Sequence, residues 1–419
     1  AHDIFVQRGG AISTGGFAEG DSGSVSLTAG NTVFLSEPFD PTFPVVIYSN
    51  QEGSGAKGNI NVTAHDVVLT NGAEILSSSQ NQAQGGGAVS VGATGSITVS
   101  NGGGKRAFGG SQGNPTITLV APEIMLDQAL VSSRTASSQN GGAITLHATA
   151  GDLTLRNNTH VLTSTEQSSG NAGQIVALAS GSISLSGNST MESRSSSVAR
   201  GDGGSVTLTA GDMVSLSGTG TALSTTTGGR GNGGSVTVNG QSVELHDHAS
   251  ISSNTTGRVT DGGKAGDILI KADTFSLNSG ATITASSTGT GAAGTVTIEG
   301  IANPAQSVLI DGANSGVFTT TSGTGAGGNI VVKANSVTLQ NGGMLSAATT
   351  GTAPSAIGGT ITVNAANTVT MSGGASMTAS SNGAADGGNI NVTGMNGITM
   401  QNSVITTEVA PPAPNTTSA

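Results

Sequence analysis

The chain has 419 residues, of which 68 are glycine and only 9% are charged, and its formal net charge is −11. This composition excludes an ordinary globular enzyme, and 13 lysines and arginines against 24 acids exclude a basic surface for nucleic acid or anionic membrane. Disordered chains usually lack β-branched residues, whereas Val, Ile and Thr recur here in alternating patterns, so we expect an ordered β protein.

The chain begins part-way through a repeat. Residues 3–14 (DIFVQRGGAIST) align without a gap to residues 336–347 (SVTLQNGGMLSA), which we expect to be the second and third strands of a coil. Residues 1–24 are therefore predicted to form an incomplete first coil. At the other end, residues 387–407 show no polar capping element. Open β-helix ends present unpaired backbone groups, so we expect them to pair with another copy or to continue into a longer parent chain.

A block of about eight residues recurs throughout residues 25–407. Examples are residues 57–64 (KGNINVTA), 203–210 (GGSVTLTA) and 358–365 (GGTITVNA). Thirteen copies are found at a mean spacing of about 30 residues, a period that is typical of a solenoid. Their first apolar residues are Val25, Ile60, Val89, Ile117, Ile144, Ile175, Val206, Val236, Ile268, Val296, Ile330, Ile361 and Ile390.

Each copy contains three short segments in which apolar and polar residues alternate. In the copy that begins at Ile60 they cover residues 60–64, 67–69 and 73–77. Such alternation predicts β-strands, and strands this short bury an apolar face only when successive copies stack on one another. We therefore expect an all-β chain, folded as a parallel β-helix (a solenoid) of about thirteen three-stranded coils, with small residues such as Ala64 at one corner.

Four segments break the repeat. Residues 37–48 (EPFDPTFPVVIY) contain three prolines, which disfavour ladder pairing, so a projecting loop is predicted. Residues 101–115 (NGGGKRAFGGSQGNP) and 301–306 (IANPAQ) predict smaller bumps. Residues 408–419 contain three further prolines and have the composition of a linker, so we expect a Pro-rich C-terminal tail that leaves the helix.

The repeated block, Gly-Gly-x-Ile-x-Val-x-Ala followed by Val-x-Leu and then Gly-Ala-x-Ile, resembles the repeat region of filamentous haemagglutinin-like exoproteins over nearly the whole chain. This resemblance implies a right-handed parallel β-helix that a Gram-negative bacterium exports by two-partner secretion. It also implies an extracellular or outer cell-surface location. The family includes adhesins, toxins and structural exoproteins, so the resemblance alone does not select an activity.

Catalysis is not predicted. Polysaccharide lyases and hydrolases need clustered carboxylates, often with a cationic side chain or calcium beside them. The acids here are scattered singly, and Asp66, Asp152, Asp212 and Asp273 each follow a first strand, where we expect them to cap their own backbone. The sequence therefore predicts no catalytic residue and no cofactor, and it favours a protein that is not an enzyme.

One tripeptide is a candidate receptor-binding site. Arg200, Gly201 and Asp202 spell an integrin-type motif in an inter-coil loop, as would suit an adhesin. The alternative is that this loop carries Gly and Asp because its turn requires them.

A second group is a candidate for metal binding. His246 and His248 flank Asp247, and two histidines two residues apart on a strand share one face. A third ligand is not apparent, and polar surface residues beside Leu245 explain the group equally well, so no metal site is predicted.

Three functions follow from these observations. The first is a structural exoprotein whose rods join head to tail into a filament, with other copies of the chain as partners. The second is an adhesin that binds a host receptor or glycan through loops 38–48 or 200–202. A polysaccharide lyase or hydrolase ranks last. No run of about 18 apolar residues is present, so we expect no insertion into a membrane.

Overall fold

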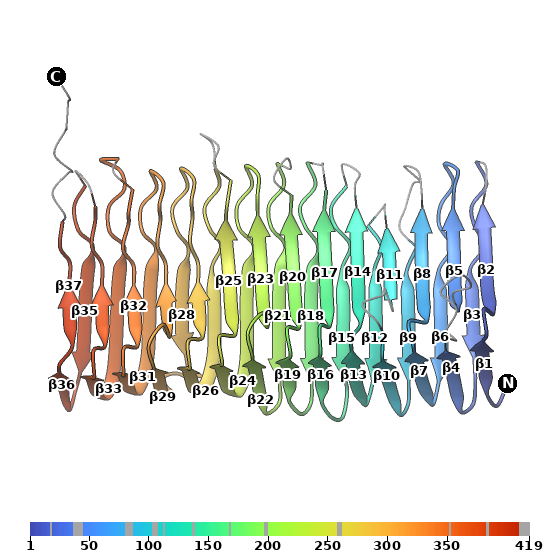
Figure 1. Cartoon of the computed structure of the whole chain (residues 1–419), viewed down its shortest axis with the longest axis horizontal. Helices are drawn as coiled ribbons and strands as arrows, with labels where there is room; N and C mark the ends of the chain where they lie inside the picture. Colours follow the sequence, from blue (N-terminus) through green and yellow to red (C-terminus); the bar gives the residue numbers. More distant parts are fainter. Residues whose placement is uncertain are drawn as a thin grey trace, which may run out of the picture.

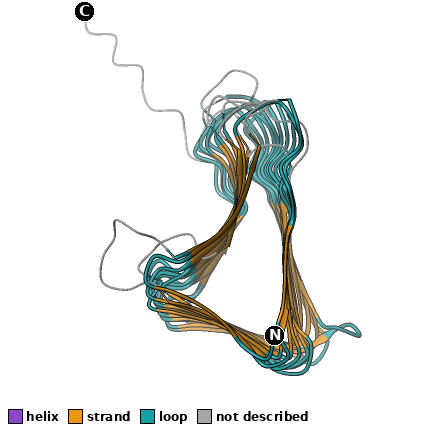
Figure 2. Ribbon diagram, turned by 90° about the vertical axis from the view of Figure 1, so that its right-hand side faces the viewer, coloured by secondary structure: helices purple, strands orange, loops and turns teal. Residues whose placement is uncertain are grey.

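A computed structural model describes the chain except for residues 17–18, 37–44, 80–86, 103–107, 112–113, 136–138, 167–168, 197–199, 258–261, 352, 383–384 and 410–419. The described residues form 37 β-strands and contain no helix. The strands wind into a long rod, with β1 at one end and β37 at the other (Figure 1). Viewed along the rod, the coils superimpose as a triangular tube with strands on three sides and turns at the corners (Figure 2).

The first side of the triangle carries the first strand of each coil. These strands are β3 (Val25–Thr28), β6 (Ile60–Ala64), β9 (Val89–Ala93), β12 (Ile117–Ala121), β15 (Ile144–Ala148), β18 (Gln174–Ala179), β21 (Ser205–Ala210), β28 (Thr295–Glu299) and β35 (Asn389–Gly394). The second side carries β1 (Ile4–Gln7), β4 (Thr32–Ser36), β7 (Asp66–Thr70), β10 (Ser96–Ser100), β13 (Glu123–Asp127), β16 (Leu153–Arg156), β19 (Ile183–Ser186), β22 (Met213–Ser217), β29 (Ala305–Asp311) and β36 (Gly397–Gln401).

Four longer strands pass from the first side to the second without a break. They are β24 (Ser235–His246), β26 (Ile268–Asn278), β31 (Asn329–Gln340) and β33 (Thr360–Ser372). The expectation of separate first and second strands is therefore wrong for these coils. Small buried residues at the corner, such as Ala334 and Ala365, let the strand bend, and the register shifts between Ala334 and Ser336 instead of ending in a turn.

The third side forms a sheet of its own, and all of its pairings are parallel. Its strands are β2 (Ala11–Gly16), β5 (Val46–Gln51), β8 (Glu74–Ser79), β11 (Phe108–Ser111), β14 (Leu130–Thr135), β17 (His160–Thr165), β20 (Thr190–Ser195), β23 (Ala222–Thr227), β25 (Ser250–Thr255), β27 (Thr282–Thr284), β30 (Gly316–Phe318), β32 (Met344–Ser346), β34 (Ser376–Thr378) and β37 (Val404–Thr406).

The predicted repeat register is confirmed residue by residue. Each of the thirteen apolar residues named above pairs with its counterpart in the next coil, from Val25 with Ile60 to Ile361 with Ile390. The chain is therefore a parallel β-helix. At about 4.8 Å per coil, thirteen coils give a rod about 60 Å long.

The first described strands also lie where the alignment places them. Strand β1 pairs in parallel with β4, so Ile4 lies beside Val33, and β2 pairs with β5, so Ile12 lies beside Ile47. Residues 4–16 therefore supply a second and a third strand to the coil that β3 follows.

The interior of the tube is a set of aliphatic columns that run parallel to the rod axis. Residues such as Ile144, Ile175 and Val206 have no exposed surface, and each pairs with the next along a column. Outward positions carry polar residues, and Thr207 pairs with Thr237 in the next coil. Because the coils are narrow, aliphatic and small side chains fill the core with few aromatic residues.

Three of the predicted irregular segments contain strand residues, since residues 305–306 of the third segment begin β29. Residues 46–48 belong to β5, and residues 108–111 form β11, which pairs with β8 and β14, so neither segment is a loop or bump throughout. The rest of the predicted loop, residues 37–44, and the tail from residue 410 lie outside the described residues. Residues 301–304 do interrupt the strands, between β28 and β29, and the Asn303–Pro304 peptide bond is cis.

A polar groove along the glycine turns

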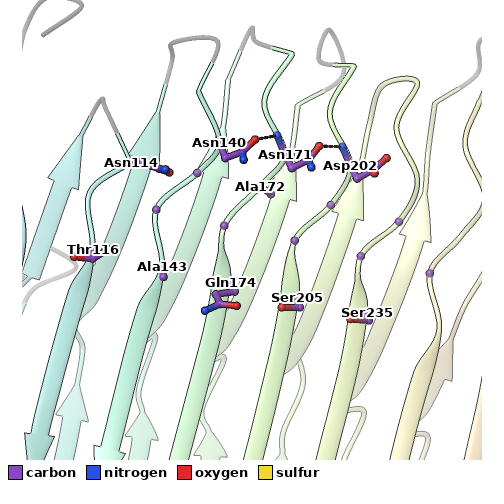
Figure 3. A pocket seen from close by; sticks show the side chains of 18 of the residues that line it. Asn114, Thr116, Asn140, Ala143, Asn171, Ala172, Gln174, Asp202, Ser205 and Ser235 are labelled. Carbon is purple, nitrogen blue, oxygen red and sulfur yellow. Dashed lines mark hydrogen bonds between the residues drawn. The ribbon is translucent and has the colours of Figure 1, made fainter. Parts of the chain in front are cut away.

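A groove of about 760 Å³ runs along the rod where each coil turns from its third side into its first. It extends over the turns of six coils, from Asn114 to Asp267, and is therefore parallel to the rod axis (Figure 3). This volume lies in the range of small-molecule binding sites in proteins.

Two rows of side chains, all polar except Ala143, border the groove, and glycines lie between them in most coils. One row comes from the turns and the other from the start of the first strands (Figure 3). The turn row contains Asn114, Asn140, Asn171 and Asp202, and the strand row contains Thr116, Ala143, Gln174, Ser205, Ser235 and Asp267. With glycine between the rows, the floor of the groove is largely bare backbone.

Stacking of the coils requires these glycines. A Cβ atom on Gly142 would lie 1.7 Å from the carbonyl oxygen of Pro115, and one on Gly234 would lie 1.6 Å from that of Gly204. Hydroxyl groups of the third strands donate to carbonyls of these turns from inside the tube: Ser133 Oγ to Pro115 O at 2.7 Å, and Ser193 Oγ to Gly173 O at 2.6 Å. Hydrogen bonding to these carbonyls offsets the cost of burying the hydroxyl groups.

The turn row forms a hydrogen-bonded ladder from coil to coil. The backbone N–H of Asn171 donates to Asn140 Oδ1 at 2.9 Å, and that of Asp202 donates to Asn171 Oδ1 at 2.8 Å (Figure 3). The ladder continues with Asn232 N to Asp202 Oδ1 at 2.6 Å and Lys264 N to Asn232 Oδ1 at 3.0 Å. One side-chain oxygen of each residue is thus used to hold the next coil.

The candidate receptor-binding tripeptide lies at this ladder. Arg200 is exposed, but Gly201 is buried, and a Cβ atom there would lie 2.0 Å from the carbonyl oxygen of Gly170. One carboxylate oxygen of Asp202 accepts the ladder bond from Asn232. The structure therefore gives Gly201 and Asp202 a place in coil stacking, and receptor binding by the tripeptide stays a prediction.

The histidine pair does not share a strand face. Strand β24 ends at His246, and Asp247 and His248 form a turn with positive φ angles of 55° and 66°. The expected arrangement is wrong because His248 lies in the turn, beyond the end of the strand, where side chains no longer alternate between two faces. His246 Nδ1 lies 2.9 Å from Asp247 Oδ2. No cluster of three or more histidine, cysteine, aspartate and glutamate side chains occurs among the described residues.

Three of the four scattered aspartates, Asp66, Asp152 and Asp273, accept hydrogen bonds from the next coil. Asp66 Oδ1 accepts hydrogen bonds from the backbone N–H and the hydroxyl of Ser96, at 2.8 and 2.9 Å, and Asp152 Oδ1 accepts the N–H of Ser182 at 2.7 Å. The sequence predicts capping correctly but names the wrong partner. Stacking brings the N–H groups of the following coil within reach of these carboxylates, about 4.8 Å along the axis.

One lysine is buried where other coils carry small residues. Lys57 occupies the turn position that Ala172 and Gly203 fill elsewhere, and only 7% of its surface is exposed. Burial lowers the pKa of Lys57 to about 8. Such a shift arises because the charged ammonium loses hydration inside the protein.

The groove and its ladder are the features that the sequence analysis missed. A signal was present, because Asn140, Asn171, Asp202 and Asn232 recur at the coil period just before the small residues of the turn.

Comparison with known proteins identifies no relative: no family model, no curated protein and no solved structure matches the chain. The described part of the chain contains no helix that could span a bilayer.

Proposed function

We propose that the protein is a secreted structural protein of the Gram-negative cell surface, and that its β-helical rods join head to tail into an extracellular filament. The resemblance of its repeats to filamentous haemagglutinin-like exoproteins supports export by two-partner secretion and an extracellular location. The β-helix supports a structural role, because its aliphatic interior and paired strands continue along the whole rod without a change of architecture.

The observation that carries the proposal is that the same inward columns run through every described coil, so that the face of one coil fits the face of any other. Ile398 and Met400 are 46% and 42% exposed, whereas the residues beside them in the preceding coil, Val369 and Met371, are fully buried. Ile405 is 36% exposed, whereas Met377 beside it in the preceding coil is fully buried. Stacked strands would cover such residues, and leaving them in water costs about 25 cal/mol per Å² of apolar surface.

Electron microscopy of material taken from the native cell surface tests the proposal. We expect filaments with an axial repeat near the length of one rod, about 60 Å. Single rods with free ends, or a protein found only inside the cell, would contradict it.

The groove supports a second candidate function, that of an adhesin. It is parallel to the axis and presents polar side chains in successive coils, as a site for an extended glycan would. A glycan array tests this function, with Gln174→Ala and Ser205→Ala in the groove and Thr297→Ala on another part of the same side as the control. Glycan binding that only the groove variants abolish would favour the adhesin, and no binding by the unaltered rod would reject it.

We further propose that the protein is not an enzyme and needs no cofactor. A hydrolase needs carboxylates that are free to act on a substrate. Here the carboxylates accept hydrogen bonds from backbone N–H groups of neighbouring coils, as at Asp66, Asp152 and Asp202. Incubation of purified rods with a panel of bacterial and host polysaccharides is expected to release no reducing ends or unsaturated products.

A further inference from the structure

We propose that the groove binds an extended, uncharged polysaccharide whose sugars are joined by β-1,4 linkages, with about one sugar over each coil. This inference rests on the candidate adhesin function of the groove and names the class of glycan that it takes. The lining residues lie between Asn114 and Asp267, so the site belongs to the middle of the rod and involves neither the first nor the last described coil.

The ladder leaves one polar atom of each turn-row side chain for a ligand. Oδ1 of Asn140 and Oδ1 of Asn171 accept N–H groups of the next coil, so the Nδ2 atoms of both amides remain as donors (Figure 3). At Asp202, Oδ1 accepts the N–H of Asn232, and Oδ2 remains as an acceptor. The turn row thus presents donors and an acceptor at successive coils, about 4.8 Å apart.

The strand row presents groups of both kinds across the glycine floor. Gln174 and Ser235 are exposed, and Ser205 is half-buried. Side-chain amides and hydroxyls both donate and accept hydrogen bonds. A sugar hydroxyl does the same, so it can bond to either row, while the glycines between the rows leave room for the sugar ring.

The spacing of the coils favours a β-1,4-linked chain. With bond lengths of about 1.5 Å, a pyranose ring joined through opposite corners advances about 5 Å per sugar, close to the spacing of the coils. Each sugar therefore meets the same two rows as the one before it. An extended peptide repeats its side chains on one face about every 6.6 Å, so it falls out of step with coils that are about 4.8 Å apart.

The charges of the groove exclude acidic glycans. Asp202 and Asp267 line it, and no lysine or arginine does so among the described residues. A polymer with a carboxylate on every sugar would bring negative charges beside these aspartates, and like charges placed together oppose binding. The ligand is therefore expected to be uncharged.

Hydrogen bonds must supply most of the affinity, because no aromatic side chain lines the groove among the described residues. One net hydrogen bond raises affinity by about fivefold. Affinity is therefore expected to rise about fivefold with each added sugar. The rise is expected to level off at about six sugars, the number of coils whose turns form the groove.

Calorimetric titration of the whole chain with oligosaccharides of increasing length tests the class of ligand. Two matched pairs separate linkage from charge. Glucose oligomers joined by β-1,4 and by β-1,3 linkages differ only in linkage, and β-1,4-linked mannose and mannuronate oligomers differ only in the carboxylate. We expect the β-1,4-linked glucose and mannose oligomers to bind at least tenfold more tightly than their counterparts.

Two variants of strand β24 locate the binding. Ser235→Ala removes an exposed hydroxyl of the groove and is expected to lower the affinity for the longest β-1,4-linked oligomers about fivefold. Thr237→Ala, two residues further along the same strand and outside the groove, is the matched control and is expected to leave the affinity unchanged. Equal affinities for the two variants would place binding elsewhere and overturn the inference.

The remaining outcomes separate this inference from the adhesin function. Equal affinity for β-1,3-linked chains, tighter binding of mannuronate, or displacement of the oligosaccharide by an extended peptide would overturn the proposed class. If Ser235→Ala still weakened the binding of another glycan, the adhesin function would stand. Absence of binding to any glycan would overturn both, and the filament would still be decided by microscopy.

Discussion

A methyl group on Gly204 would lie 1.8 Å from the carbonyl oxygen of Gly173 in the preceding coil. The φ angle of Gly204 is not in the left-handed region, so the requirement for glycine comes from the approach of two backbones and not from backbone conformation. Coil spacing at this corner is thus set by a contact that no other residue type can make.

Replacement of Gly204 by alanine is therefore expected to destabilise the rod. Relief of the overlap must move one coil away from the next, and overpacking of this kind typically costs about 1–3 kcal/mol. Urea unfolding monitored by circular dichroism measures the loss. Gly92→Ala is the matched control, because a Cβ atom there meets nothing within 4 Å. Equal unfolding midpoints for the two variants would show that the close approach is unimportant.

Asn171→Ala is expected to weaken the ladder along the groove. It removes the acceptor of the Asp202 N–H, and an unmade hydrogen bond of this kind costs about 1 kcal/mol. Hydrogen exchange at the Asp202 amide is expected to become about fivefold faster, while Asn171→Asp, which keeps the acceptor oxygen, is expected to retain the protection. Unchanged exchange in the alanine variant would mean that the ladder does not hold the next coil.

The burial of Lys57 predicts a dependence of stability on pH. Because its folded pKa of about 8 lies below the usual 10.5, the unfolded chain binds more protons between these values. Stability contributed by this residue therefore rises as pH increases from about 8 to 10.5. Thermal midpoints across this range measure the effect.

Lys57→Met is expected to be more stable than the unaltered rod at pH 7. Its stability is also expected not to rise between about pH 8 and 10.5. Methionine removes the charge and keeps most of the volume of the side chain. Lys264→Met, at an exposed position, serves as the control and is expected to keep the rise. If the stability of Lys57→Met still rises with pH, the rise comes from other titrating groups.

Phe275 is the largest fully buried side chain among the described residues, and its neighbours along the column, Val243 and Val308, are smaller. Phe275→Ala is expected to cost about 3–5 kcal/mol, because coils held at a fixed spacing cannot collapse into the cavity. Thr297→Ala, at an outward position of a neighbouring coil, is expected to change stability by less than about 0.5 kcal/mol. Similar unfolding midpoints for Phe275→Ala and Thr297→Ala would contradict a rigid column of side chains.

Much of the fold could be predicted because each coil repeats the same alternation of apolar and polar residues. Thirteen copies of one alternating pattern fix which residues face inward, and a register error of one residue at Ile60 or Val206 would turn every aliphatic side chain outward. Partners in other coils could not be predicted in the same way. Asp66 and Ser96 are 30 residues apart in sequence, and only the stacking distance shows that the carboxylate caps the later coil.

The site was harder to predict than the fold for a physical reason. A residue such as Asp202 forms a turn, accepts a hydrogen bond and borders a groove, and the sequence pattern is the same for all three roles. His248 was harder to place for another reason. The sequence pattern assigns it to a strand, but it lies in a left-handed turn, a conformation that usually holds asparagine or glycine.

The ladder hydrogen bonds of all three sides run parallel to the rod axis, which gives the molecule a distinct mechanical behaviour. Tension along the axis pulls directly on the bonds between coils, so the rod opens one coil at a time and not in a single shear event. Each opened coil replaces about 5 Å of rod by about 100 Å of extended chain. Under load, such a rod would act as an extensible tether that lengthens greatly before any covalent bond is strained.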